Sequence, residues 1–145
     1  MVKVEVVYTG GLHCEAVHAP SRSKLTSDAP VDNQGRGESF SPTDLVATAL
    51  GTCMLTTMGI VAARNGWKLE GATAEVEKSM VADPARRIAK LDVTIRVPEA
   101  LDADARELLE RTAHGCPVNR SLSPAVEVPV RFEWGTRAMR GARPA

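Results

Sequence analysis

The sequence predicts an α+β fold in a single domain of residues 1–134, and three observations predict it. Short segments near both ends alternate apolar and polar residues, as strands with one solvent-facing side do. One long apolar segment, residues 41–65, carries clear helix start and stop signals. The elements follow one another as strands, helix, strands, helix and strand, and not as the alternating strand–helix units that build a parallel sheet.

Three strands are predicted before residue 28. Val2–Tyr8 alternates apolar and charged residues, Gly10-Gly11 is a tight-turn signal, and Leu12–Val17 then returns as a second strand. Lys24–Ser27 is a short third strand. Residues 28–40 are rich in Pro, Gly, Asn and Asp, which favour turns, so this segment is expected to be a loop.

The long helix has a defined beginning and end. Ser41 is a good N-cap, Pro42 suits the first helical position, and Asp44 completes a capping box with Ser41. Arg64 suits the last turn, and Asn65-Gly66 is a common signal for the C-terminal end of a helix. The sequence therefore predicts a helix from residue 42 to residue 64.

The polar residues of this helix form one narrow line. They recur at every fourth position: Thr48, Thr52 and Thr56. Gly51 and Gly59 are expected to let another backbone come close. Residues 45–63 contain no charge and approach the length that spans a bilayer, but the threonines and glycines favour a soluble helix that is buried on most sides.

The second half of the chain continues with a predicted hairpin. Ala72–Met80 alternates, Asp83-Pro84 turns the chain, and Arg87–Val97 alternates strongly, which predicts a two-stranded unit with one wet face.

One further helix and one strand complete the domain. Asp102 is expected to cap a helix that runs through His114 and ends at Gly115, and a short helical turn is expected after Pro117. Val126–Trp134 alternates as a last strand, in which Pro129 indicates an edge position. Residues 135–145 show no periodicity and are expected to form a frayed tail.

The charge balance excludes several classes of function. The 145 residues include 18 Lys+Arg and 18 Asp+Glu, so no positive field would gather phosphates or an anionic membrane. Only 3% of the residues are aromatic, which leaves no obvious base-stacking platform. The N-terminal segment has no long apolar stretch and is not a signal peptide. We therefore expect a cytoplasmic protein without nucleic-acid or membrane partners.

Three cysteines are the unusual feature of the composition, an odd and sparse number for a disulfide scaffold. Cys53 lies mid-helix, roughly 16 Å from the helix N-terminus, where the dipole helps a thiolate little. Cys116 precedes Pro117 and is a candidate N-cap, a position that favours a thiolate, and His114 could add positive charge. Taken alone, any one of them is more often just a small buried hydrophobe, and nothing lifts Cys14 above that interpretation.

A metal site is not expected. His13-Cys14 and His114-x-Cys116 lack the paired spacing of structural zinc sites.

Two motifs resemble a known family. Residues 41–53, Ser-Pro-Thr-Asp-Leu-Val-Ala-Thr-Ala-Leu-Gly-Thr-Cys, resemble the signature helix of the OsmC/Ohr family of osmotically inducible and organic hydroperoxide resistance proteins. His114-Gly-Cys-Pro-Val-Asn-Arg120, followed by Ser123-Pro124, is similar to that family's second-cysteine motif. The resemblance extends from about Val2 to Trp134.

The resemblance implies a fold and an activity. The fold would be antiparallel sheets wrapped around a long central helix in an intertwined homodimer. The activity would be that of a two-cysteine thiol peroxidase acting on organic hydroperoxides in oxidative-stress defence, without a cofactor. Cys53 matches the peroxidatic cysteine, Cys116 matches the resolving cysteine that would form a disulfide with it, and a dithiol, often lipoyl-type, would be the reductant. Cys14 would be a bystander.

The supporting residues match the family less closely. Thr43 stands where the hydroperoxide-resistance branch has a glutamate, and Asp44 is the nearest acid. Leu12 and His13 stand where that branch has an arginine. The OsmC branch has an arginine in the loop before the helix, for which Arg36 is the first candidate and Arg22 the second; such arginines are also ordinary solvated loop charges.

Helix geometry limits what Asp44 can do. It precedes Cys53 by nine residues, or about 13–14 Å of helical rise, and lies on the opposite face, so it could serve only the site of another chain. A plain capping role is the alternative for Asp44.

Two other functions fit the same sequence. The missing arginine and glutamate matches favour a non-peroxidatic dimer of the same fold that binds an apolar small molecule. A thiol–disulfide sensor without turnover would use the same two cysteines. In an oxidised enzyme, the Cα atoms of Cys53 and Cys116 are expected within roughly 7 Å of each other.

Overall fold

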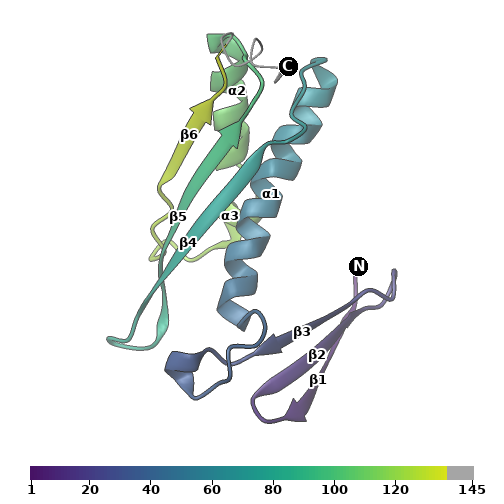
Figure 1. Cartoon of the computed structure of the whole chain (residues 1–145), viewed down its shortest axis with the longest axis vertical. Helices are drawn as coiled ribbons and strands as arrows, with labels where there is room; N and C mark the ends of the chain where they lie inside the picture. Colours follow the sequence, from purple (N-terminus) through teal and green to yellow (C-terminus); the bar gives the residue numbers. More distant parts are fainter. Residues whose placement is uncertain (137–145) are drawn as a thin grey trace, which may run out of the picture. The chain divides into compact units, whose positions relative to one another are not determined.

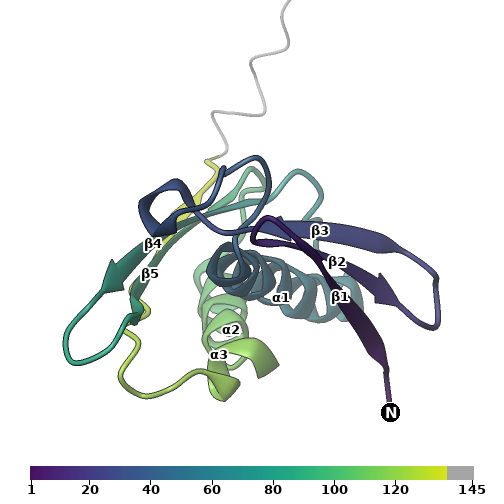
Figure 2. The ribbon, with the colours of Figure 1, turned by 90° about the horizontal axis from the view of Figure 1, so that it is seen from below.

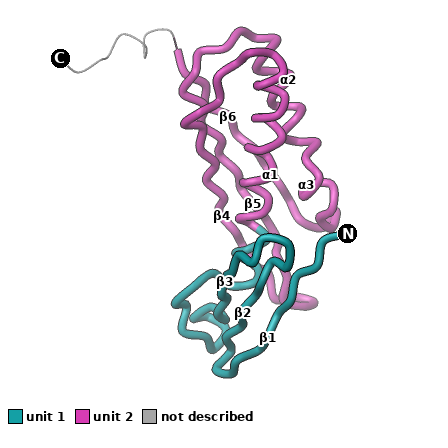
Figure 3. The backbone as a smooth tube through the Cα atoms, turned by 90° about the vertical axis from the view of Figure 1, so that its right-hand side faces the viewer, with its two compact units in different colours: residues 1–46 teal, residues 47–145 magenta. Residues whose placement is uncertain are grey.

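The chain forms two compact units in a computed structural model that describes residues 1–136. The first unit comprises residues 1–46 and the second begins at residue 47, so the boundary falls inside the long helix (Figure 3). Most of the tail expected from residue 135 onward lies outside the described residues.

The first unit is built on a three-stranded antiparallel sheet (Figure 1). Its strands are β1 (Val4–Gly10), β2 (His13–His18) and β3 (Lys24–Asp28), in the order β1-β2-β3. The Gly10-Gly11 turn joins β1 to β2, as predicted, and both glycines have positive φ. The predicted loop follows β3 and contains one short 3-10 helix, η1 (Val31–Asn33).

The first unit has no apolar core of its own. Among the described residues, every fully buried apolar side chain lies at residue 47 or beyond. Apolar side chains of β1 stay exposed instead: Val4 by 57%, Val6 by 63% and Tyr8 by 63%. A three-stranded sheet needs a covered apolar face to be stable, and residues 1–46 by themselves leave these β1 side chains uncovered.

The long helix α1 (Pro42–Arg64) has the predicted bounds. The Ser41 N–H donates to Asp44 Oδ2 at 2.8 Å, and the Asp44 N–H donates to Ser41 Oγ at 3.1 Å, which is the predicted capping box. At the other end Gly66 adopts φ 69°, and the Trp67 N–H donates to the Ala62 carbonyl at 2.9 Å. This left-handed glycine ends the helix.

Within the chain α1 is buried along one side only. Its buried residues recur at helical spacing: Ala47, Leu50, Gly51, Met54, Met58 and Ala62. The expected burial on most sides is not reached within the single chain, in which the three threonines of the polar line and Ile60 are exposed. By length and composition α1 could cross a membrane, a test that the core helix of a soluble protein also passes.

The second unit packs helices on a mixed sheet. The sheet contains β4 (Thr73–Val81), β5 (Arg87–Val97) and β6 (Val130–Trp134), in the order β4-β5-β6. Figure 2 shows α1 and the helices α2 (Ala103–His114) and α3 (Pro117–Ser121) on one face of this sheet. The side of β5 that carries Leu91, Val93, Ile95 and Val97 forms the centre of the core.

The β5–β6 pair departs from the expected antiparallel sheets, because the two strands run parallel. The predicted edge position of the last strand is confirmed, but its regular ladder begins at Val130 and not at Val126. Pro129 has no N–H to donate, although its carbonyl still accepts from the Val93 N–H at 2.9 Å. The missing donor explains the late start of β6.

Gly51 lets α1 approach a strand of its own chain. A Cβ atom placed there would lie 3.1 Å from Val76 Cγ2 and 3.6 Å from Ala74 Cβ, and both partners belong to β4. A Cβ at Gly59 would lie 3.9 Å from Leu69 Cδ2. Within the chain, the close approach expected at Gly51 is the one between α1 and β4.

Candidate functional site

The structure brings Cys53 and Cys116 together in the second unit. Cys53 is half-buried on α1, and Cys116 is only 1% exposed at the start of α3. Both are free thiols, and the Cys53 side chain lies near enough to the Cys116 thiol to raise its pKa. Two cysteines that are 63 residues apart in sequence thus form one dithiol pair.

Local chain geometry holds Cys116 in place. Gly115 closes α2, where its N–H donates to the Arg111 carbonyl at 3.1 Å, and the Cys116 N–H donates to the Ala113 carbonyl at 3.2 Å. Cys116 is extended, with φ −62° and ψ 148°, and its Sγ accepts from the Asn119 N–H at 3.4 Å. The sulfur therefore occupies the predicted N-cap position of α3.

The predicted preference of Cys116 for a thiolate is wrong. Burial raises the pKa of the Cys116 thiol, and the side chain of Cys53 raises it further, while the Asn119 N–H lowers it by less than burial raises it. His114 has no part in this balance: its ring is exposed and packs edge-on against Phe132 with centroids 5.9 Å apart. Cys116 is therefore held as a protonated thiol next to Cys53.

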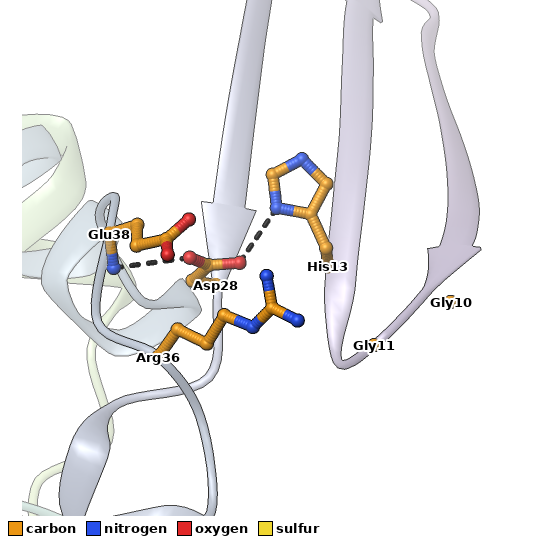
Figure 4. A pocket seen from close by; sticks show the side chains of 6 residues that line it. All are labelled: Gly10, Gly11, His13, Asp28, Arg36 and Glu38. Atoms are coloured by element: carbon orange, nitrogen blue, oxygen red, sulfur yellow. Dashed lines mark hydrogen bonds and ion pairs between the residues drawn. The ribbon is translucent and has the colours of Figure 1, made fainter.

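A second cluster of charged side chains lies in the first unit (Figure 4). Asp28, at the end of β3, is only 5% exposed; its Oδ1 lies 2.7 Å from His13 Nδ1, and its Oδ2 accepts from the Glu38 N–H at 3.1 Å. The bond from His13 lowers the pKa of the Asp28 carboxyl, with smaller contributions from the Glu38 N–H and the Arg36 charge. Asp28 is thus a buried carboxylate.

These residues line a cavity of about 330 Å³ together with Arg36, Gly10 and Gly11. The sequence marked His13 as the residue at the position of a family arginine and as part of a metal pair that was not expected to bind, and no signal pointed to Asp28. Their pairing depends on the β2–β3 register, in which the two residues stand opposite each other.

The predicted supporting residues lie in different places. Arg36 lines the cavity. Arg22 lies in the turn at the far end of the β2–β3 hairpin, with φ 61° and its N–H donating to the His18 carbonyl at 2.8 Å. Asp44 makes the α1 capping box. Cys14 lies on β2 in the first unit, opposite Tyr8 and Ser27.

Comparison with known families decides the identity of the fold. The profile of the OsmC-like proteins matches residues 35–131. The chain belongs to the OsmC/Ohr family. The family resemblance drawn from the two motifs is therefore confirmed, and so is the α+β fold.

Solved structures of other family proteins have the same fold. A Psychrobacter arcticus protein, assigned provisionally to osmotic stress induction and the detoxification response, is 43% identical, with a TM-score of 0.87 over 92% of this chain and 96% of that one. The Legionella pneumophila organic hydroperoxide resistance protein OsmC is 20% identical, with a TM-score of 0.75 over 92% and 96%. The organic hydroperoxide resistance protein OhrB of Bacillus subtilis is 17% identical, with a TM-score of 0.66 over 92% and 98%. The last two likenesses show the fold alone. A search of curated proteins finds no match.

Proposed function

We propose that this OsmC/Ohr protein is a cytoplasmic thiol peroxidase that reduces organic hydroperoxides in oxidative-stress defence. Cys53 is the peroxidatic cysteine and Cys116 the resolving cysteine. The observation that carries the proposal is the proximity of the two free thiols, of which Cys53 is half-buried and Cys116 fully buried. The family's hydroperoxide resistance proteins support the choice of substrate.

The first step takes place at the accessible sulfur. The Cys53 thiolate attacks the distal oxygen of ROOH, so an S–O bond forms and the O–O bond breaks. The leaving alkoxide takes up a proton and departs as ROH, and Cys53 is left as a sulfenic acid. Cys53 suits this role because it is half-buried, whereas Cys116 is closed off from a substrate.

The second step uses the buried thiol. Cys116 attacks the sulfenic sulfur, the S–S bond forms, and the S–O bond breaks; the hydroxyl group leaves as water with the proton of Cys116. A raised pKa keeps Cys116 in the thiol form, which limits its own reaction with hydroperoxide. A dithiol of the lipoyl type named above then reduces the disulfide by two exchanges and becomes a cyclic disulfide.

We further propose that the working form is a homodimer. The sheet of the first unit has no apolar core among the described residues, and Val4, Val6 and Tyr8 are exposed on β1. A second copy of the chain would cover these side chains. Arg36 stays a predicted cation for the Cys53 site. It belongs to the first unit, whereas Cys53 belongs to the second.

Three serine variants test the mechanism in a turnover assay with cumene hydroperoxide and dihydrolipoamide. Cys53→Ser should abolish oxidation of the protein. Cys116→Ser should consume one equivalent of hydroperoxide, accumulate the sulfenic acid at Cys53 and lose disulfide formation. Serine is a preferred N-cap, so this variant keeps the acceptor for the Asn119 N–H. Cys14→Ser is the matched control and should keep full turnover.

The outcomes separate the three functions. Turnover together with a Cys53–Cys116 disulfide, identified by peptide mass spectrometry, supports the peroxidase. A disulfide without turnover would replace the enzyme by a thiol–disulfide sensor. A protein that hydroperoxide does not oxidise at all would leave a binding module for an apolar molecule.

A further inference from the structure

The cavity of the first unit has a charge arrangement of which the peroxidase proposal uses only Arg36. It is lined by the buried Asp28, by the Gly10-Gly11 turn and by the side chains of Arg36 and Glu38 (Figure 4). Every lining residue belongs to residues 1–46, so the cavity is complete within one compact unit.

Asp28 is already satisfied by protein groups. One carboxylate oxygen contacts His13 Nδ1 at 2.7 Å and the other accepts the Glu38 N–H at 3.1 Å. Its charge is therefore compensated locally, and it fixes the positions of His13 on β2 and of residue 38 in the loop. A ligand has little to gain from Asp28 itself.

Arg36 and Glu38 are different, because their side chains form no hydrogen bond and no ion pair with any residue in 1–136. The two residues flank Gly37, which has φ 64°, and both face the same cavity. They do not pair with each other although they are two residues apart. One cavity thus presents a guanidinium and a carboxylate that make no hydrogen bond or ion pair with the described residues, although the Arg36 charge acts on Asp28.

We propose that this cavity binds a small zwitterion of the α-amino acid class, whose carboxylate pairs with Arg36 and whose ammonium group pairs with Glu38. A guanidinium binds a carboxylate through two parallel hydrogen bonds, and an ammonium group offers three donors to carboxylate oxygens. The charges of Arg36 and Glu38 sum to zero, as do the two charges of a zwitterion, so binding such a ligand leaves the net charge of the cavity unchanged. A simple anion would instead meet the repulsion of Glu38.

The cavity has room for such a ligand and for its side chain. Its volume of about 330 Å³ is that of a small-molecule site. Gly10 and Gly11 have no heavy atom within 4 Å of the position that a Cβ would take, so the wall at the turn is open. This opening is where a ligand side chain would project.

The test is a titration of the ¹⁵N-labelled full-length protein followed by amide chemical shifts. The probes are glycine, acetate, which carries only the carboxylate, and methylamine, which carries only the ammonium group. Glycine should shift the amides of Gly10, Gly11 and Glu38 with a Kd on the order of 1 mM, and each of the other probes should bind about tenfold more weakly.

Charge-neutralising variants test which residue binds each end of the ligand. Arg36→Gln and Glu38→Gln should each weaken glycine binding about tenfold. Arg22→Gln is the matched control, because it removes the same charge from the other end of the same hairpin, and it should leave the Kd within about twofold.

Three results would overturn the proposal. Glycine that leaves these amides unshifted would remove the site. Acetate that binds as tightly as glycine, with Glu38→Gln binding more tightly still, would make it a plain anion site. Equal losses in Arg22→Gln and Arg36→Gln would show a general charge effect. All variants change exposed residues, and their amide spectra check that the fold is kept.

Discussion

The close contact at Gly51 of α1 predicts whether an alanine at this position would stabilise or destabilise the protein. A Cβ there would lie 3.1 Å from Val76 Cγ2, whereas carbon atoms in ordinary contact are about 3.5–4.0 Å apart. Gly51→Ala therefore needs a shift of about half an ångström between α1 and β4. Overpacking of this kind costs about 1–3 kcal/mol, while replacing glycine by alanine in a helix gains about 1 kcal/mol.

The net effect of Gly51→Ala is a loss of about 1 kcal/mol in the free energy of unfolding. Gly59→Ala is the matched control on the same helix. Its Cβ would lie 3.9 Å from Leu69 Cδ2, an ordinary contact, so the variant should gain about 1 kcal/mol. The two substitutions are chemically identical and are expected to differ by about 2 kcal/mol in stability.

Urea unfolding followed by circular dichroism measures both changes, and repeating it at two protein concentrations separates unfolding from dimer dissociation. The double variant Gly51→Ala/Val76→Ala isolates the contact, because without Cγ2 the alanine at position 51 should become stabilising by about 1 kcal/mol relative to Val76→Ala alone. If Gly51→Ala were as stabilising as Gly59→Ala, the close approach of α1 to β4 would not be what requires a glycine.

Three further predictions follow from the caps and the titratable groups. Ser41→Ala should lower the free energy of unfolding by about 1 kcal/mol, measured by urea titration, because the Asp44 N–H loses its acceptor. The folded pKa of Asp28 is lowered, so its contribution to stability is fully present above its unfolded pKa of about 3.9 and is lost as pH falls through the lower folded value. Asp28→Asn should therefore flatten the decline of the melting temperature below about pH 4, and a variant that keeps the full decline would contradict this. Alkylation of Cys116, measured in a Cys53→Ser background that keeps its burial, should have a pH midpoint above that of a free cysteine; a lower midpoint would show that the helix cap outweighs burial.

Local signals in the sequence predicted the helices well. The bounds of α1 and α2 follow from Ser41 and Asp102, whose side chains accept the helix N–H groups, and from the glycines at their ends. β5 was also predicted with its observed bounds, because its alternation is unbroken. Each of these signals is complete within a few residues of the chain.

The features that the sequence left open depend on distant residues. The direction of β6 relative to β5 is a matter of long-range pairing, which alternation does not encode. Gly51 could be read as a packing glycine, but its partner on β4 could not be named. Cys116 was recognised as an N-cap, yet its pKa depends on how deeply the core closes over it. The link between His13 and Asp28 requires the β2–β3 register.

The sulfur of Cys116 also provides a natural spectroscopic reporter. The amide proton of Asn119 points at this sulfur, 3.4 Å away from the nitrogen, so its resonance and its exchange with solvent depend on what the sulfur is bonded to. Alkylation or oxidation of Cys116 would replace the S–H group and change the charge and shape that this proton meets. The redox state of a buried cysteine can thus be followed at a backbone amide three residues away, without a dye or a label on the thiol.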